Sequence, residues 1–88
     1  MLERKIVVDL QQKGYIVTKP VLANTKYLPD LLAFKNNKKY AIIYRERDDI
    51  NKYLELCDNH QFKLVYCYYN FNKCVYIYTD INGLEIVL

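Results

Sequence analysis

The sequence has 88 residues, with 13 Lys and Arg against 10 Asp and Glu, so its formal net charge is +3. This length suits one small domain, expected to span residues 1–88, and a hydrophobic content of 52% excludes intrinsic disorder. No apolar run approaches the roughly 18 residues of a membrane span, and the charged start is not expected to be a signal peptide. Three cysteines without a C-x-x-C pair are typical of a reducing, cytoplasmic compartment, and together with the single histidine they are not expected to form a zinc site.

The charge is unevenly distributed along the chain. Residues 1–44 contain eight Lys and Arg against three Asp and Glu, whereas residues 45–88 contain five against seven. This asymmetry predicts a basic face that would suit a polyanion such as nucleic acid. Codon usage explains the excess of lysine equally well, because Lys, Asn, Ile and Tyr, all with A/T-rich codons, make up 36 of the 88 residues.

The chain begins with a predicted helix over residues 2–13. Apolar side chains recur every four residues from Leu2 to Leu10, which gives the helix one apolar stripe. Gly14 follows directly and can adopt the left-handed conformation that ends a helix. The β-branched and aromatic residues 15–17 then predict a short strand.

The middle of the chain predicts a β-hairpin preceded by a less regular segment. The polar run NNK separates two stretches of apolar residues, which is typical of a hairpin turn. The predicted segments are a loop or edge strand over 21–28, a buried strand over 31–34, a turn over 35–38 and a returning strand over 39–45.

The second half predicts a helix and a second hairpin. Ile50, Tyr53, Leu54 and Cys57 have the i, i+3, i+4, i+7 spacing of an amphipathic helix over 49–60. Asp48 or Asp49 is expected to cap its start, strands are expected over 63–69 and 74–79, and the turn Asn82-Gly83 is followed by a final strand or tail. The element order α-β-β-β-α-β-β predicts an α/β fold, with a small mixed sheet flanked by two helices.

This arrangement resembles the PD-(D/E)XK nuclease superfamily, most closely the archaeal Holliday-junction resolvases. LERKIVVDLQQKGYIV is similar to the first helix of the family, and Glu3 falls where that helix carries a metal-site glutamate. Pro29-Asp30 matches the PD element, and NNKKYAIIYR is similar to the returning strand of the hairpin. The resemblance covers most of the chain and implies a restriction-endonuclease-like fold, a DNA substrate, a Mg²⁺ or Mn²⁺ cofactor and a homodimer.

The sequence departs from the family at two of its four catalytic positions. The family pattern Glu-x-Lys reads Ile43-Tyr44-Arg45, although strand alternation still directs residues 43 and 45 toward Asp30. Isoleucine cannot bind a metal, and arginine cannot lose a proton at neutral pH. We therefore expect a catalytically degenerate protein that needs no cofactor, in which Glu3, Asp30, Ile43 and Arg45 are vestigial. Replacing Ile43 by Glu and Arg45 by Lys is then expected to restore metal binding.

Several alternatives remain open for these residues. Glu46 supplies a relocated carboxylate if the strand ends in a bulge, and Asp30, Glu3 and Glu46 would then hold Mg²⁺ or Mn²⁺ in an active nuclease. Each residue also has an ordinary structural role, since Asp30 can form a turn after Pro29 and Glu3 favours the start of a helix. Arg45-Glu46-Arg47 can be a solvated strand end.

The leading functional interpretation is a nuclease-like pseudoenzyme that binds branched or duplex DNA without cleaving it. Lysine and arginine side chains bind phosphates independently of sequence. The expected contacts are Lys19, Lys26, Arg45 and Arg47. The alternative from another class is a protein-interaction or regulatory module built on an inactive nuclease fold.

Overall fold

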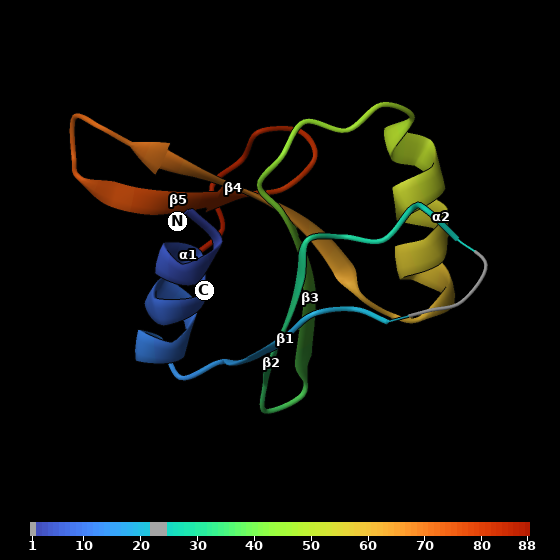
Figure 1. Ribbon diagram of the computed structural model, residues 1–88, viewed down its shortest axis with the longest axis horizontal. Helices are drawn as coiled ribbons and strands as arrows, with labels where there is room; N and C mark the ends of the chain where they lie inside the picture. The colour runs from blue at the N-terminus through green and yellow to red at the C-terminus, as the bar shows by residue number, and fades with distance from the viewer. Residues whose placement is uncertain (1, 22–24) are drawn as a thin grey trace.

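A mixed β-sheet lies between two helices in the computed structural model, which describes residues 2–21 and 25–88 (Figure 1). The elements are α1 (Leu2–Gln12), β1 (Ile16–Thr18), β2 (Leu31–Lys35), β3 (Lys38–Ile43), α2 (Ile50–Asn59), β4 (Lys63–Asn70) and β5 (Val75–Thr79). This order confirms the predicted α/β class with a small mixed sheet and two flanking helices. Part of the segment predicted as a loop or edge strand, residues 22–24, lies outside the described residues.

The five strands lie side by side in chain order, β1-β2-β3-β4-β5. All neighbours are antiparallel except β3 and β4, which are parallel and are joined through α2. A parallel pair needs such a crossover, because its connection must return to the starting end of the sheet. The sheet is therefore built from a three-stranded antiparallel part, β1-β2-β3, and the β4–β5 hairpin, and α2 connects them.

Both faces of the sheet are covered, so the central strand is buried on both sides. Ile42 and Ile43 point to opposite faces of β3 and are 0% and 1% exposed. Burying each such side chain contributes about 1.5–3 kcal/mol. The cluster under α1 contains Ile6, Leu10, Leu31, Ala33, Ile42, Val65, Cys67 and Tyr78. The cluster under α2 contains Ala41, Ile43, Tyr53, Cys57 and Leu64.

The carboxyl ends of both helices are held by lysines of the β2–β3 hairpin. Gly14 has a φ of +93° and ends α1 as predicted, and Lys35 Nζ donates a hydrogen bond of 2.8 Å to the carbonyl oxygen of Lys13. Lys39 Nζ donates likewise, at 2.9 Å, to the carbonyl oxygen of His60 after α2. Each ammonium group also faces the negative end of a helix dipole. This hairpin therefore fixes both helices against the sheet.

The β2–β3 hairpin is tighter than predicted, and β3 ends earlier. Lys35 pairs with Lys38, so only Asn36 and Asn37 form the turn, and the φ of +55° at Asn36 is one that asparagine tolerates well. The strand ends at Ile43, whereas the sequence predicted strand as far as residue 45.

The predicted cap of α2 has the expected position but not the expected contact. Asp49, one of the two residues expected at the start of α2, occupies the N-cap position before Ile50, but its side chain makes no capping hydrogen bond and its backbone is left-handed, with φ 53°. In the β4–β5 hairpin Cys67 lies opposite Tyr78. Cys67 is buried, but Cys74 is exposed in the turn, and all three cysteines are free thiols.

No helix among the described residues combines the length and apolar character needed to cross a membrane.

Candidate functional site

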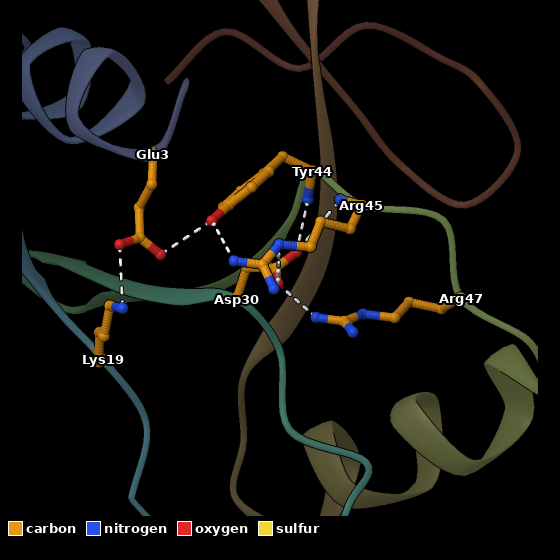
Figure 2. A network of polar contacts seen from close by, with 6 residues as sticks. All are labelled: Glu3, Lys19, Asp30, Tyr44, Arg45 and Arg47. Carbon is orange, nitrogen blue, oxygen red and sulfur yellow. Dashed lines mark hydrogen bonds and ion pairs between the residues drawn. The ribbon is translucent and has the colours of Figure 1, made fainter. Parts of the chain in front are cut away.

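Polar side chains meet at the end of the sheet where β1 and β3 end and where β2 begins, next to the first turn of α1 (Figure 2). The residues of this polar network are Glu3, Lys19, Asp30, Tyr44, Arg45 and Arg47. Hydrogen bonds and ion pairs connect them across four separate parts of the chain.

Asp30 lies at the centre of the polar network, and its side chain is only 3% exposed. Its Oδ2 accepts hydrogen bonds from the backbone N–H groups of Tyr44, at 2.9 Å, and Arg45, at 3.2 Å. Its Oδ1 forms an ion pair with the Arg47 guanidinium and lies 3.6 Å from Nε of Arg45. Two backbone donors and two cations therefore compensate the burial of this carboxylate, which would otherwise be costly.

The same contacts explain why β3 ends at Ile43. The register pairs Leu31 with Ile42, so its continuation by one residue places Asp30 opposite Ile43 on the same face of the sheet. The next two backbone N–H groups of the chain bind the Asp30 carboxylate instead of a neighbouring strand. The chain then leaves the sheet and brings Arg47 back toward Asp30, as Figure 2 shows.

Tyr44 connects Glu3 to Arg45. Its hydroxyl donates to Oε1 of Glu3 at 2.8 Å and accepts from Nη2 of Arg45 at 3.0 Å. Lys19 Nζ lies 2.9 Å from the other carboxylate oxygen of Glu3. The pKa of Glu3 is lowered mainly by the hydrogen bond from Lys19 and, to a smaller extent, by the one from Tyr44. The pKa of Tyr44 is raised mainly by burial and, to a smaller extent, by its hydrogen bond to Glu3. Both groups therefore keep their ordinary charge at neutral pH.

The three cations of the polar network differ in their access to solvent. The side chains of Lys19 and Arg45 are 66% and 60% exposed, whereas that of Arg47 is 22% exposed. The Arg47 guanidinium also lies over the ring of Tyr53 in α2, 5.6 Å from its centroid. Its Nε is buried without a hydrogen-bond partner among the described residues. Lys19 and Arg45 can therefore reach a ligand, while Arg47 is committed to the protein.

Five residues singled out in the sequence converge in this network, and three others do not join it. Lys26 lies over the ring of its neighbour Tyr27, 5.5 Å from the centroid. Glu46 is exposed and forms no ion pair within the described residues, so the relocated carboxylate does not join Asp30 and Glu3. Ile43 is on the expected face, but its side chain belongs to the apolar cluster under α2.

Tyr44 is the member of the network that the sequence did not indicate as functional. Strand alternation placed its side chain on the face opposite to those of Ile43 and Arg45. The sequence feature that could have indicated Tyr44 is its position next to Arg45. If the strand ends before these two residues, the alternation of sides no longer applies, and both side chains can reach the same end of the sheet.

The residues of the network do not fit a divalent metal. A hard cation needs several free oxygen ligands, and the carboxylates of Asp30 and Glu3 are bound by arginine, lysine and tyrosine side chains. Across residues 2–21 and 25–88, no group of three or more His, Cys, Asp and Glu side chains is placed to hold a metal ion.

No protein-family model matches the sequence, and no curated protein matches it.

Proposed function

We propose that this protein binds branched or duplex nucleic acid through the polar network at the end of the sheet and does not cleave it. The proposal rests on one observation above all, namely that the Asp30 carboxylate is bound by Arg45 and Arg47. In the resemblance to the PD-(D/E)XK nucleases, Asp30 corresponds to a metal ligand that faces the DNA backbone. Arginine side chains bind this carboxylate in place of a metal, and the exposed one, Arg45, can attract phosphate directly.

Lys19 and Arg45 are the proposed phosphate contacts. Both are mostly exposed, and the network contains three cations against two carboxylates, so it keeps an excess of positive charge. Arg45 remains close to Tyr44 and Asp30, which orients its guanidinium at little further cost in side-chain entropy. Lys26, exposed on the segment before β2, is a further proposed phosphate contact outside the network, and Arg47 positions Asp30.

The absence of cleavage follows from the chemistry of the same groups. Metal-dependent hydrolysis needs carboxylates that hold the ion and a group that accepts a proton. Asp30 and Glu3 already bind cations of the protein, and hydrogen bonding to Tyr44 raises the pKa of Arg45 further. Arg45 therefore stays protonated and can serve only as an electrostatic contact.

Fluorescence anisotropy with a labelled four-way junction and a labelled duplex tests the proposal. We expect binding that weakens as salt increases from about 50 to 200 mM, and substitution of Lys19 or Arg45 by Ala should reduce the salt slope by about 1 each. Lys38→Ala, at the exposed first residue of β3, is the matched control and should leave the slope unchanged. No binding to either DNA at low salt would contradict the proposal.

Cleavage and self-association need separate measurements. Incubation of the labelled junction with Mg²⁺ or Mn²⁺ should leave it intact, and cleavage that disappears in Asp30→Ala would instead support an active nuclease. The homodimer implied by the resemblance remains a prediction, which sedimentation velocity of the free chain tests directly.

A further inference from the structure

An apolar groove lies on a different surface, between α1 and the β4–β5 hairpin. Leu2 and Val8 line it from the helix, and Tyr69, Phe71 and Tyr76 line it from the hairpin. The ring of Tyr69 contacts both other aromatic rings, with centroid distances of 5.0 Å to each. Figure 1 shows the hairpin extending beyond the rest of the sheet on the side of α1. The groove is therefore bounded on one side by α1 and on the other by the rings of Tyr69, Phe71 and Tyr76, which we call the aromatic wall.

This groove exposes more apolar surface than the local structure requires. Phe71 is 82% exposed in the turn between β4 and β5, while Leu2 and Val8 are 46% and 44% exposed. A turn has no need of an aromatic residue, and water contact with a phenyl ring is unfavourable. Clustered apolar side chains of this kind on a small protein are typical of a surface that a partner covers.

The charges around the groove are all positive. Arg4 and Lys5 line it, both are exposed, and neither forms an ion pair within the part of the chain that the structure describes. The two acids of α1, Glu3 and Asp9, are already paired with lysines. Cations in the first turns of a helix also oppose its dipole, so these residues reduce the stability of α1. Their side chains are available for an external acidic group.

We propose that this groove binds a segment of a partner protein in which an apolar side chain is flanked by carboxylates. The apolar side chain would enter between α1 and the aromatic wall, and the carboxylates would pair with Arg4 and Lys5. The groove does not contain Lys19 or Arg45, so this inference is independent of nucleic-acid binding.

The geometry disfavours the two other occupants. A symmetric contact between two copies would bring the Arg4 and Lys5 side chains of both together without an acid between them. Single-stranded nucleic acid prefers exposed rings that stack with successive bases. The ring planes of Tyr69 and Phe71 are inclined by 81°, and those of Tyr69 and Tyr76 by 65°, so they form a notch and not a flat platform.

Fluorescence anisotropy with two synthetic helical peptides tests the proposal. Both peptides have about 16 residues with Leu and Trp at helical spacing, and their polar face carries either Glu or Lys. The Glu peptide should bind more tightly, and Phe71→Ser should weaken it by about tenfold or more. Arg4→Glu combined with Lys5→Glu should reverse the preference toward the Lys peptide, a result that general loss of structure cannot produce.

Matched variants on other surfaces complete the experiment. Ile16→Ser, at an apolar side chain of β1 that is 70% exposed, and Lys38→Glu combined with Lys63→Glu should leave the affinity for the Glu peptide unchanged. The proposal is overturned if neither peptide binds at about 1 mM, or if Phe71→Ser has no effect. It is equally overturned if sedimentation shows a dimer that Phe71→Ser dissociates, or if an oligothymidylate binds and this variant abolishes the binding.

Discussion

Asp30 and Arg47 form an ion pair across the end of the sheet, with side chains only 3% and 22% exposed. Arg45 also approaches Asp30, at 3.6 Å from Nε, but its own side chain is 60% exposed. Solvent screens the exposed pair, whereas loss of Arg47 leaves a buried carboxylate with less compensation. The two arginines should therefore differ in their effect on stability.

We predict that Arg47→Met lowers the free energy of unfolding by about 2–4 kcal/mol, and that Arg45→Met lowers it by about 1 kcal/mol or less. Methionine retains most of the aliphatic packing, so the comparison isolates the charge. Urea denaturation measures both values. In an Asp30→Asn background the cost of Arg47→Met should decrease, and equal costs for the two arginines would show that Arg47 is not the main partner of Asp30.

Burial separates the three thiols into two groups. Burial raises the pKa of Cys57 to about 11 and that of Cys67 to about 12, while Cys74 is exposed in the β4–β5 turn. Thiolate is the reactive form, so Ellman's reagent at about pH 8 should modify one thiol rapidly and the other two at least about 100-fold more slowly. Cys74→Ser should remove the rapid phase, and two rapid thiols in the wild-type protein would contradict the packing described.

The pairing of Glu3 with Lys19 should make stability depend on acid pH. Hydrogen bonds from Lys19 and Tyr44 lower the pKa of Glu3 in the folded protein below that of the unfolded chain. The unfolded chain therefore binds more protons between these two values, so stability rises with pH in that interval and is lost as pH falls through the folded pKa. This contribution is complete above the ordinary value of 4.5.

The variant Glu3→Gln removes this titration. Its difference from the wild type in free energy of unfolding should be largest near neutral pH and should shrink as pH falls from about 6 to 3, measured by urea denaturation at each pH. Lys19→Met should give the same flattening, but should have little further effect in the Glu3→Gln background. A difference between Glu3→Gln and wild type that stays constant with pH would mean that Glu3 is not paired in solution.

The helices and the order of helices and strands along the chain were predictable from the sequence because they depend on local patterns. Leu2, Ile6 and Leu10 marked the apolar side of α1, although Leu2 is partly exposed, and Tyr53 and Cys57 marked that of α2. These patterns survive in the fold because each helix covers one face of the sheet. The end of β3 was not predictable, because it depends on Asp30, which lies 14 residues before Tyr44.

Five of the six residues of the candidate site were predictable from the sequence, whereas Tyr44 and the chemistry of the site were not. Glu3, Asp30 and Arg45 were singled out as remnants of a metal site, and the fold brings them together. Their pairing with Lys19 and Arg47 depends on where β1 ends and where the chain turns after β3. A residue count along the sequence cannot supply either position, so the sequence predicted a degenerate site but still left a metal site open as an alternative.

The last prediction concerns the repair of the metal site suggested by the sequence, Ile43→Glu combined with Arg45→Lys. Ile43 is 1% exposed and packs with Ala41 and Tyr53 under α2, so a charged side chain there should cost at least about 3 kcal/mol. Ile43→Val, the matched control, should cost about 0.5–1.5 kcal/mol.

The double variant should also fail to bind Mn²⁺, because Arg47 still holds the Asp30 oxygen that a metal would need. Isothermal calorimetry on the double variant, with its fold checked by circular dichroism, measures this affinity. Adding Arg47→Met removes the competing cation and should raise the affinity for Mn²⁺ in whatever fraction remains folded. Tight Mn²⁺ binding by the double variant with Arg47 intact would show that a metal displaces Arg47 from Asp30. The interpretation that Arg47 takes the place of the metal would then be wrong.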